Sequence, residues 1–266
     1  MTHVGTRQHG ASKRRAITAM GVPFFKSEWM ESGDDPLRSP TISLIEQAPH
    51  STLGTHFHRQ NQFQLFVHGG GTIGRDTLAP VTVHYAGAYT GYGPLVAGAE
   101  GIHYFTIRPV CESGAIPAGQ AREQMVRGPK RHVQAGPIAC MPPGSLAALQ
   151  APQSEDVIAV AQDGLGARVH RLPPHAWLQP AVPPATDCTF AVVLGGSLAQ
   201  GGRTLQRWDS LAWWADEAPP PLQAGPQGAE CILLFTPPKA QAYQEAMIAA
   251  LAPDHPASQS ARSSVG

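Results

Sequence analysis

The chain has 266 residues, including 28 glycines and 26 prolines; 42% of its residues are hydrophobic and only 14% are charged. This composition is too apolar for a disordered chain and too rich in turn-forming residues for long helices, so it predicts many short strands. The formal net charge is zero. It therefore gives no electrostatic reason to expect nucleic acid or an acidic membrane as a partner.

The cysteines and the hydropathy pattern predict a cytoplasmic protein. Cys111, Cys140, Cys188 and Cys231 are widely spaced and form no C-x-x-C pair, so we expect reduced thiols rather than a zinc or redox motif. The N-terminus has no apolar segment of signal-peptide length, and no apolar run approaches about 18 residues. We expect no membrane partner.

Taken in chain order, the first 20 residues are predicted to be a disordered tail, and the first stretch with the features of a site is 54–69. His56 and His58 are two residues apart, so in a strand their side chains leave the same face. Two imidazoles on one face, joined by a donor from the next strand, form the kind of site that holds a metal ion.

The run that begins at Gln62 alternates between polar and apolar faces. Its even-numbered positions face one way and are expected to line a pocket for a small oxygenated ligand, together with Tyr92; these positions are Gln62, Gln64 and Phe66. Its odd-numbered positions need cover from a second domain or from the partner in a homodimer; these are Phe63, Leu65 and Val67. The glycines at 69–71 are expected to form a hairpin turn.

An internal repeat organises the rest of the chain. Residues 97–109 align with 224–236, since each segment is a glycine-containing turn followed by an apolar run. Upstream, 66–70 aligns with 192–196 in the same order. Two matched segments about 126 residues apart predict a duplicated β-domain. Helix is expected to be scarce, with 238–251 as the best candidate.

These residues resemble the first motif of the cupin superfamily, in which a Gly precedes H-x-H, a Glu and a second Gly. His56, His58, Gln62 and Gly69 fall at matching steps, with Gln62 in place of the usual Glu. With the repeat, the chain resembles a bicupin, which implies an all-β fold of two jelly-roll barrels, or double-stranded β-helices, in tandem. We expect an N-terminal cupin domain over 21–125, a C-terminal one over 126–252 and a disordered tail over 253–266.

The resemblance implies a third histidine ligand, but the turn at 91–94 that corresponds to the second cupin motif contains none. Two histidines are candidates. His84 shares a strand face with Thr82 and has the more polar surroundings, whereas His103 has the more usual spacing from His56. We favour His84 as the third ligand and keep His103 as the alternative.

The second copy has no plausible set of ligands, because Val182, Pro184 and Cys188 stand at the positions that match the two histidines and Gln62. The resemblance therefore implies one divalent metal per chain, Fe, Mn, Ni or Zn, and a small organic substrate, with Fe(II) dioxygenase chemistry as one form. The alternative is a non-catalytic ligand-binding or structural bicupin whose metal site has decayed. The sequence names no catalytic acid or base.

Overall fold

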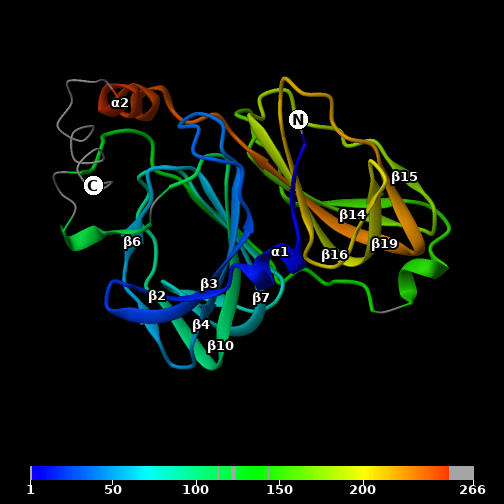
Figure 1. The fold of residues 1–266 in the computed structure, drawn as a ribbon, viewed down its shortest axis with the longest axis horizontal. Helices are drawn as coiled ribbons and strands as arrows, with labels where there is room; N and C mark the ends of the chain where they lie inside the picture. The colour runs from blue at the N-terminus through cyan, green and yellow to red at the C-terminus, as the bar shows by residue number, and fades with distance from the viewer. Residues whose placement is uncertain (1, 113, 121–123, 143, 252–266) are drawn as a thin grey trace.

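Two large antiparallel β-sheets make up most of the chain. The computed structural model describes residues 2–112, 114–120, 124–142 and 144–251. Figure 1 shows the two sheets as units that lie side by side, with little helix, which confirms the predicted all-β fold. Within the described ranges, no helix is both long and apolar enough to cross a bilayer.

The first sheet comes from the N-terminal half of the chain. Its elements, with the short pair β6 and β11, are β2 (Arg15–Ala19), β3 (Val22–Met30), β4 (Thr41–Gln47), β5 (Thr52–Leu53), β6 (His56–Phe57), β7 (Gln62–Ile73), β8 (Asp76–Leu78), β9 (Thr82–Ala86), β10 (Leu95–Arg108), β11 (Ile116–Pro117), the 3-10 helix η1 (Ala118–Gln120) and β12 (His132–Ala135). The strand order is β12-β9-β7-β10-β4-β3-β2, with β5 on β10 and β8 on β7.

The second sheet comes from the C-terminal half and the first residues of the chain. Its elements, with the three remaining helices, are β1 (His3–Gly5), α1 (Arg7–Ser12), η2 (Ser145–Ala148), β13 (Gln153–Ile158), β14 (Gly166–Leu172), β15 (Trp177–Leu178), β16 (Cys188–Gln200), β17 (Arg203–Leu205), β18 (Ser210–Trp214), β19 (Leu222–Thr236) and α2 (Gln241–Leu251). The strand order is β1-β18-β16-β19-β14-β13, with β15 on β19 and β17 on β16.

The two sheets repeat one strand pattern. The order β9-β7-β10-β4 in the first matches β18-β16-β19-β14 in the second, and each strand begins about 126 residues after its counterpart. Both copies contain the same pair of glycines with positive φ, Gly69 with Gly101 and Gly196 with Gly228. A Cβ at Gly69 would lie 2.0 Å from the Gly101 carbonyl oxygen, and one at Gly196 would lie 2.1 Å from that of Gly228. Only glycine fits where these two strands cross, so both copies of the repeat keep a glycine at each of these positions for the same steric reason.

The glycines at 69–71 do not form the hairpin turn that the sequence predicted. They lie inside β7, where Gly69 and Gly71 pair with Ile102 and Ala97 of β10. The chain turns later, at Gly74, which has a φ of 59°. The missing side chains let the two long strands approach closely at an irregularity in their register.

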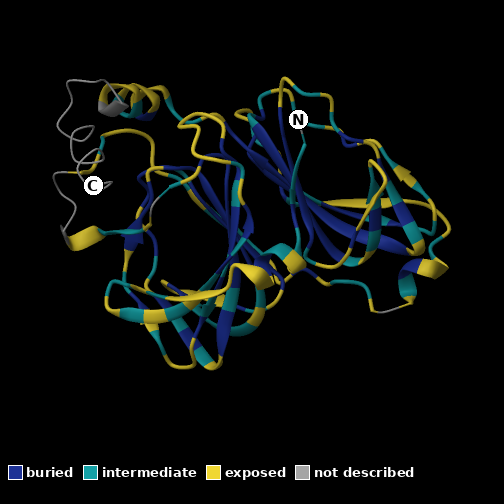
Figure 2. Cartoon of the chain, viewed as in Figure 1, coloured by how far each residue is buried: buried dark blue, intermediate teal, exposed yellow. Residues whose placement is uncertain are grey.

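One apolar core joins the two sheets. Phe63 and Leu65 of β7 are fully buried in it. Phe190 and Leu234 of the second sheet belong to the same cluster, and Val67 packs at its margin. The odd-numbered face of β7 is therefore covered by the other barrel of the same chain. Figure 2 shows buried strands concentrated where the two units face each other.

The interiors of the two barrels differ. The C-terminal barrel is filled by apolar side chains, among them Trp213, Leu233 and Phe235. The N-terminal barrel has an apolar cluster that includes Phe66 and Tyr104. However, it also buries polar side chains on β7 and β9, among them Gln64 and His84. Burying polar groups is unfavourable unless they are paired, so this barrel is the one with the features of a site.

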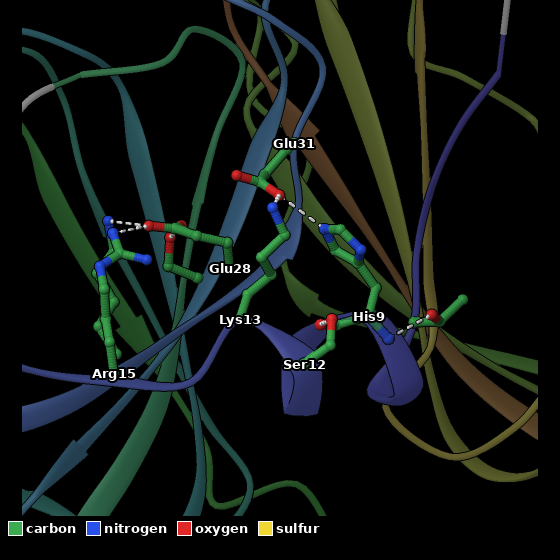
Figure 3. Close-up of polar contacts among 9 residues, drawn as sticks. His9, Ser12, Lys13, Arg15, Glu28 and Glu31 are labelled. Atoms are coloured by element: carbon green, nitrogen blue, oxygen red, sulfur yellow. Dashed lines mark hydrogen bonds and ion pairs between the residues drawn. The ribbon is translucent and has the colours of Figure 1, made fainter.

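The first 20 residues are not the disordered tail that the sequence predicted. β1 pairs with β18 of the second sheet, and α1 then carries the chain across to β2 and β3 of the first (Figure 1). Thr6 caps α1 by accepting a hydrogen bond from the His9 backbone N–H. The other end is fixed to β3 by Glu31, whose carboxylate lies 2.7 Å from His9 Nε2 and 3.4 Å from Lys13 Nζ (Figure 3).

The C-terminal helix crosses in the opposite direction. α2 follows β19 but lies over the N-terminal barrel (Figure 1), close to the predicted range of 238–251. Tyr243 is its anchor: it is 2% exposed and packs on Phe57 and Tyr89, and its hydroxyl donates to the Pro129 carbonyl oxygen. The N-terminal end of the chain thus packs on the C-terminal barrel, and the C-terminal helix packs on the N-terminal barrel. The predicted tail at 253–266 lies outside the described residues.

The predicted domain boundary at 125/126 also falls too early. β12 pairs with β9 through Val133 and Gln134, which lie opposite Tyr85 and His84, so the first sheet continues to Ala135. The sequence contained no signal for this short edge strand, because the pairing partner lies about 50 residues upstream.

The shared core predicts that the two barrels unfold together. Phe63→Ala removes a fully buried ring between them and should lower the free energy of unfolding by about 3–5 kcal/mol. Urea denaturation followed by near-UV and far-UV circular dichroism should show one transition at a lower midpoint. Trp177→Ala is the control, because Trp177 is 64% exposed. Two separate transitions, only one of them shifted, would contradict a common core.

Candidate functional site

A small cavity of about 100 Å³ opens into the polar interior of the N-terminal barrel. Strands of the first sheet, β6 and the connecting segments that contain His58, Tyr92 and Glu112 contribute to its wall. The polar side chains that line it are Lys26, His56, His58, Gln64, Tyr92, Tyr104, Thr106, Arg108 and Glu112. Because side chains alternate along a strand, residues 104, 106 and 108 of β10 all face inward while Phe105 and Ile107 enter the shared core.

A chain of hydrogen bonds with a single direction runs along one side of this cavity. Arg108 Nε donates to Gln62 Oε1 at 2.7 Å, and Gln62 Nε2 donates to the Tyr92 hydroxyl at 2.8 Å. The Tyr92 hydroxyl lies 3.0 Å from His56 Nε2, and His56 Nδ1 lies 2.7 Å from the Gly54 carbonyl oxygen. Because a carbonyl only accepts, His56 carries its proton on Nδ1, and Tyr92 donates to Nε2. Because the Arg108 guanidinium at the other end of the chain can only donate, it fixes the orientations of Gln62, Tyr92 and His56.

The second histidine lies against the same guanidinium. Arg108 Nη2 is 3.3 Å from both ring nitrogens of His58, so it lies beside the edge between them rather than in line with one lone pair. His58 Nδ1 is 3.1 Å from the Gly114 carbonyl oxygen and 3.6 Å from Glu112 Oε2. Glu112 is itself held by the Arg59 backbone N–H at 2.7 Å.

Burial decides the protonation of these groups. Desolvation, followed by the charge of neighbouring groups, lowers the pKa of His56 to about 4, and desolvation and the Arg108 charge lower the pKa of His58. Burial opposes ionisation of Glu112 too, but the interaction with His58, the attraction of the Arg108 charge and the hydrogen bond from the Arg59 N–H outweigh it and leave its pKa below the ordinary value. At neutral pH these four side chains are therefore two neutral imidazoles, one guanidinium and one carboxylate.

Comparison with known proteins identifies solved structures of similar architecture. No protein-family model and no curated protein sequence matches the chain. Among solved structures, a Nostoc punctiforme protein proposed to be a dioxygenase has a TM-score of 0.56 at 12% identity, covering 89% of this chain and 79% of that one. Bacillus subtilis oxalate decarboxylase has a TM-score of 0.54 at 10% identity, covering 86% and 76%. Escherichia coli pirin YhhW in complex with nickel(II) has a TM-score of 0.49 at 17% identity, covering 90% and 100%.

The chain has the cupin fold. The repeated strand order corresponds to the bicupin arrangement that the sequence predicted. At these identities the likeness concerns the fold alone, so the site has to be described from its own residues.

The cupin barrel brings together only part of the predicted ligand set. His56 and His58 lie with their ring centroids 5.4 Å apart, and Gln62 is joined to His56 through Tyr92. His84 does face the interior, but its Nδ1 bonds Gln64 Oε1 at 3.0 Å. It lines a different hollow with His132, on the other side of the Tyr92 ring.

The alternative third ligand and the predicted pocket base lie elsewhere. His103 packs beside His68 at a centroid distance of 4.6 Å, in an outer groove with Trp208 of the second unit. Phe66 faces the interior and packs on Tyr104, below the polar layer. Gln64 and Tyr92 line the cavity itself.

The described residues do not fit a divalent metal as they stand. They contain no group of three or more His, Cys, Asp or Glu side chains placed to hold a metal ion. Arg108, a permanent cation that would repel a metal, lies against both ring nitrogens of His58, and the Tyr92 hydroxyl occupies His56 Nε2. Sequence reasoning missed this arginine and Glu112. The signal was the alternation along β10, which places residue 108 on the inner face.

Buried neutral histidines make the protein sensitive to acid. Burial, followed by the charges of His132 and His56, lowers the pKa of His84 to about 3, whereas an unfolded histidine titrates near 6.5. The unfolded chain therefore takes up a proton first as the pH falls below about 6.5, and stability is lost from there down toward pH 3. His84→Gln should reduce the loss between pH 7 and pH 5 by about 1–2 kcal/mol.

The measurement is urea denaturation at the two pH values in buffer with EDTA. His50→Asn is the matched control, because His50 is exposed and has a φ of 59°, which asparagine tolerates. An equal loss of stability in the wild type and in His84→Gln would contradict a neutral buried His84.

Proposed function

We propose that the N-terminal barrel binds a small organic carboxylate and that Arg108 is the residue that holds it. One observation carries this proposal. The Arg108 side chain is 8% exposed and faces the cavity, yet among the described residues no carboxylate lies within 4.0 Å of its guanidinium. Its hydrogen-bond partners there, Gln62 and His58, are neutral.

Glu112 lies in the same cavity wall and its carboxylate attracts the Arg108 charge, but the two form no ion pair. A ligand carboxylate bound directly to the guanidinium would therefore stabilise a buried cation that lacks a directly paired anion. Arg108 uses Nε for Gln62 and Nη2 for a long contact with His58. The described contacts do not use Nη1, so a planar guanidinium edge remains for a carboxylate to bind through two parallel hydrogen bonds. Thr106, one pleat away on β10, lines the same wall, and its hydroxyl donates to the Ser43 carbonyl oxygen.

The cavity volume limits the ligand to a few heavy atoms. About 100 Å³ is well below the range of about 300–1,000 Å³ typical of drug-sized ligands. Acids of two to four carbons fit this space. A cupin fold is shared with a protein named as an oxalate decarboxylase, whose substrate is a small dicarboxylate, and this likeness supports the same ligand class here.

The position of Gln62 supports the proposal as well. A glutamate at this position would put a carboxylate 2.7 Å from the guanidinium and would neutralise it. It would also leave the Tyr92 hydroxyl without the donor that Gln62 Nε2 now provides. The amide keeps the Arg108 charge available for a ligand.

Oxalate should raise the melting temperature of the wild type by about 5 °C or more when it is present at 100 times its dissociation constant, and Arg108→Gln should lose this shift. Gln62→Glu should weaken binding at least about tenfold, because the new carboxylate competes for the guanidinium. The assay is thermal denaturation in sodium oxalate, malonate or acetate, with sodium chloride at equal ionic strength as reference.

Arg14→Gln is the control variant, because Arg14 pairs with Glu46 and 42% of its side chain is exposed. It should keep the full shift. An oxalate shift of the same size in the wild type and in Arg108→Gln would overturn the proposal.

A second candidate keeps the divalent metal that the sequence predicted, with dioxygenase-like chemistry on a small organic molecule. The observation in its favour is that each histidine has Nδ1 beside a backbone carbonyl, His56 at 2.7 Å from Gly54 and His58 at 3.1 Å from Gly114. Such contacts hold Nε2 as the metal-binding atom in many metal sites. Arg108 would have to leave its present position for a metal to bind there.

Metal content separates the two candidates. We expect elemental analysis of protein purified without chelators to find much less than one equivalent of Fe, Mn, Ni or Zn, and no difference between the wild type and the His56→Ala/His58→Ala double variant. One equivalent in the wild type and none in the double variant would favour the metal site over direct binding by Arg108. Oxygen uptake with candidate acids would then test for dioxygenase activity.

A further inference from the structure

A second and larger cavity lies between the two barrels, beneath α2. Its volume is about 350 Å³, which is enough for a small organic molecule. The wall combines loop residues of the N-terminal half with Asp187 just before β16, Trp214 at the end of β18, and residues of α2 and of the segment that leads to it from β19. The lining residues used below are Gln60, Val110, Asp187, Trp214, Lys239 and Met247.

Three polar side chains in this cavity lack strong partners. Lys239 Nζ contacts Met247 Sδ at 3.4 Å, and a thioether is a weak acceptor. Within the described residues, no carboxylate lies within 4.0 Å of Lys239, and Asp187 has neither an ion pair nor a side-chain hydrogen bond. Gln60 is 7% exposed, and its buried Oε1 has no hydrogen-bond partner there.

The electrostatics agree with groups that are desolvated but unpaired. Burial lowers the pKa of Lys239 to about 8, even though Glu112 and Asp187 attract its charge. Burial also raises the pKa of Asp187, although Arg38 opposes this effect. In each case the loss of water is larger than the gain from the opposite charge. A ligand with charges of both signs would reverse that balance.

The rest of the wall is apolar. Trp214 is 4% exposed and Val110 is 7% exposed, while Met247 and Ile248 of α2 cover the cavity from above. Arg38 lies over the Trp214 ring at 5.1 Å and is paired with Asp216 outside. The cavity wall therefore combines an ammonium group, two oxygen acceptors, and an aromatic and aliphatic surface.

We propose that this cavity binds a free α-amino acid with an apolar side chain. Lys239 would receive the carboxylate, Asp187 and the Gln60 amide oxygen would receive the ammonium group, and the side chain would pack on Trp214 and Met247. The site is separate from the Arg108 cavity, because the two cavities share no lining residue among those that the structure describes.

Isothermal titration calorimetry with L-phenylalanine tests this proposal by measuring its affinity for the wild type. Two analogues test the same contacts without any substitution in the protein. 3-Phenylpropionate lacks the ammonium group and phenethylamine lacks the carboxylate, so each should bind the wild type at least about tenfold more weakly than L-phenylalanine does. Lys239→Met should weaken L-phenylalanine binding by a similar factor. Lys13→Met is its control, because Lys13 pairs with Glu31 far from the cavity and 48% of its side chain is exposed.

Asp187→Asn should weaken L-phenylalanine but leave 3-phenylpropionate unchanged, which a general loss of packing would not do. Equal affinity of the wild type for L-phenylalanine and 3-phenylpropionate, or for L-phenylalanine in the wild type and Lys239→Met, would overturn the proposal. So would no binding of L-phenylalanine at millimolar concentration. Arg108→Gln should keep the binding; if Arg108→Gln loses it while Lys239→Met keeps it, the amino acid occupies the barrel cavity instead.

Discussion

The interaction on which the N-terminal site depends is the hydrogen bond from Arg108 Nε to Gln62 Oε1, 2.7 Å long and buried inside the barrel. A guanidinium cannot lose its proton at physiological pH, so this contact fixes the orientation of the Gln62 amide. The amide then orients Tyr92, and Tyr92 orients His56. One permanent charge thus sets the orientation of three side chains, and our proposal of a carboxylate ligand rests on the same charge.

The two barrels of the cupin fold have different roles: the N-terminal barrel contains Arg108, and the C-terminal barrel supports it from outside. The C-terminal barrel has an apolar interior, and its outer face covers Phe63 and Leu65, the back of the strand that carries Gln62 and Gln64. The exchange of chain ends adds to this joint, since β1 pairs within the second sheet and Tyr243 of α2 anchors on the first barrel. The segment between β19 and α2 crosses the joint, and α2 contributes Met247 and Ile248 to the wall of the inter-barrel cavity. Two copies of one fold have therefore produced two different pockets, one inside a barrel and one between barrels.

The sequence predicted the features that depend on local periodicity. The alternation after Gln62 identified the inner and outer faces of β7, and the spacing of His56 and His58 placed both rings in one cavity. The two aligned segments revealed the duplication, although the alignment of 66–70 was one residue out of register, since Gly69 corresponds to Gly196. The structure adds the reason for these glycines: the crossing of two long strands leaves no room for a Cβ at Gly69. The short apolar run at the C-terminus predicted α2 to within a few residues.

What the sequence did not predict depends on contacts between distant segments. β1 has three residues and pairs with a strand about 200 positions away, so no local pattern marks it. His84 was correctly placed on an inner face, but periodicity does not say how far around the barrel a side chain lies, and Tyr92 separates it from His56. Arg108 was missed because it ends an apolar strand, where an arginine ordinarily reaches solvent.

A crystal structure of the protein purified without chelators and grown in sodium oxalate, with anomalous data at the Fe, Ni and Zn edges, tests the central claim most directly. We predict a carboxylate bound to the Arg108 guanidinium, with the hydrogen bonds from Arg108 through Gln62 and Tyr92 to His56 intact, and no anomalous peak at the histidines. An anomalous peak within about 2.2 Å of His56 and His58 Nε2, with Arg108 turned away, would contradict the account.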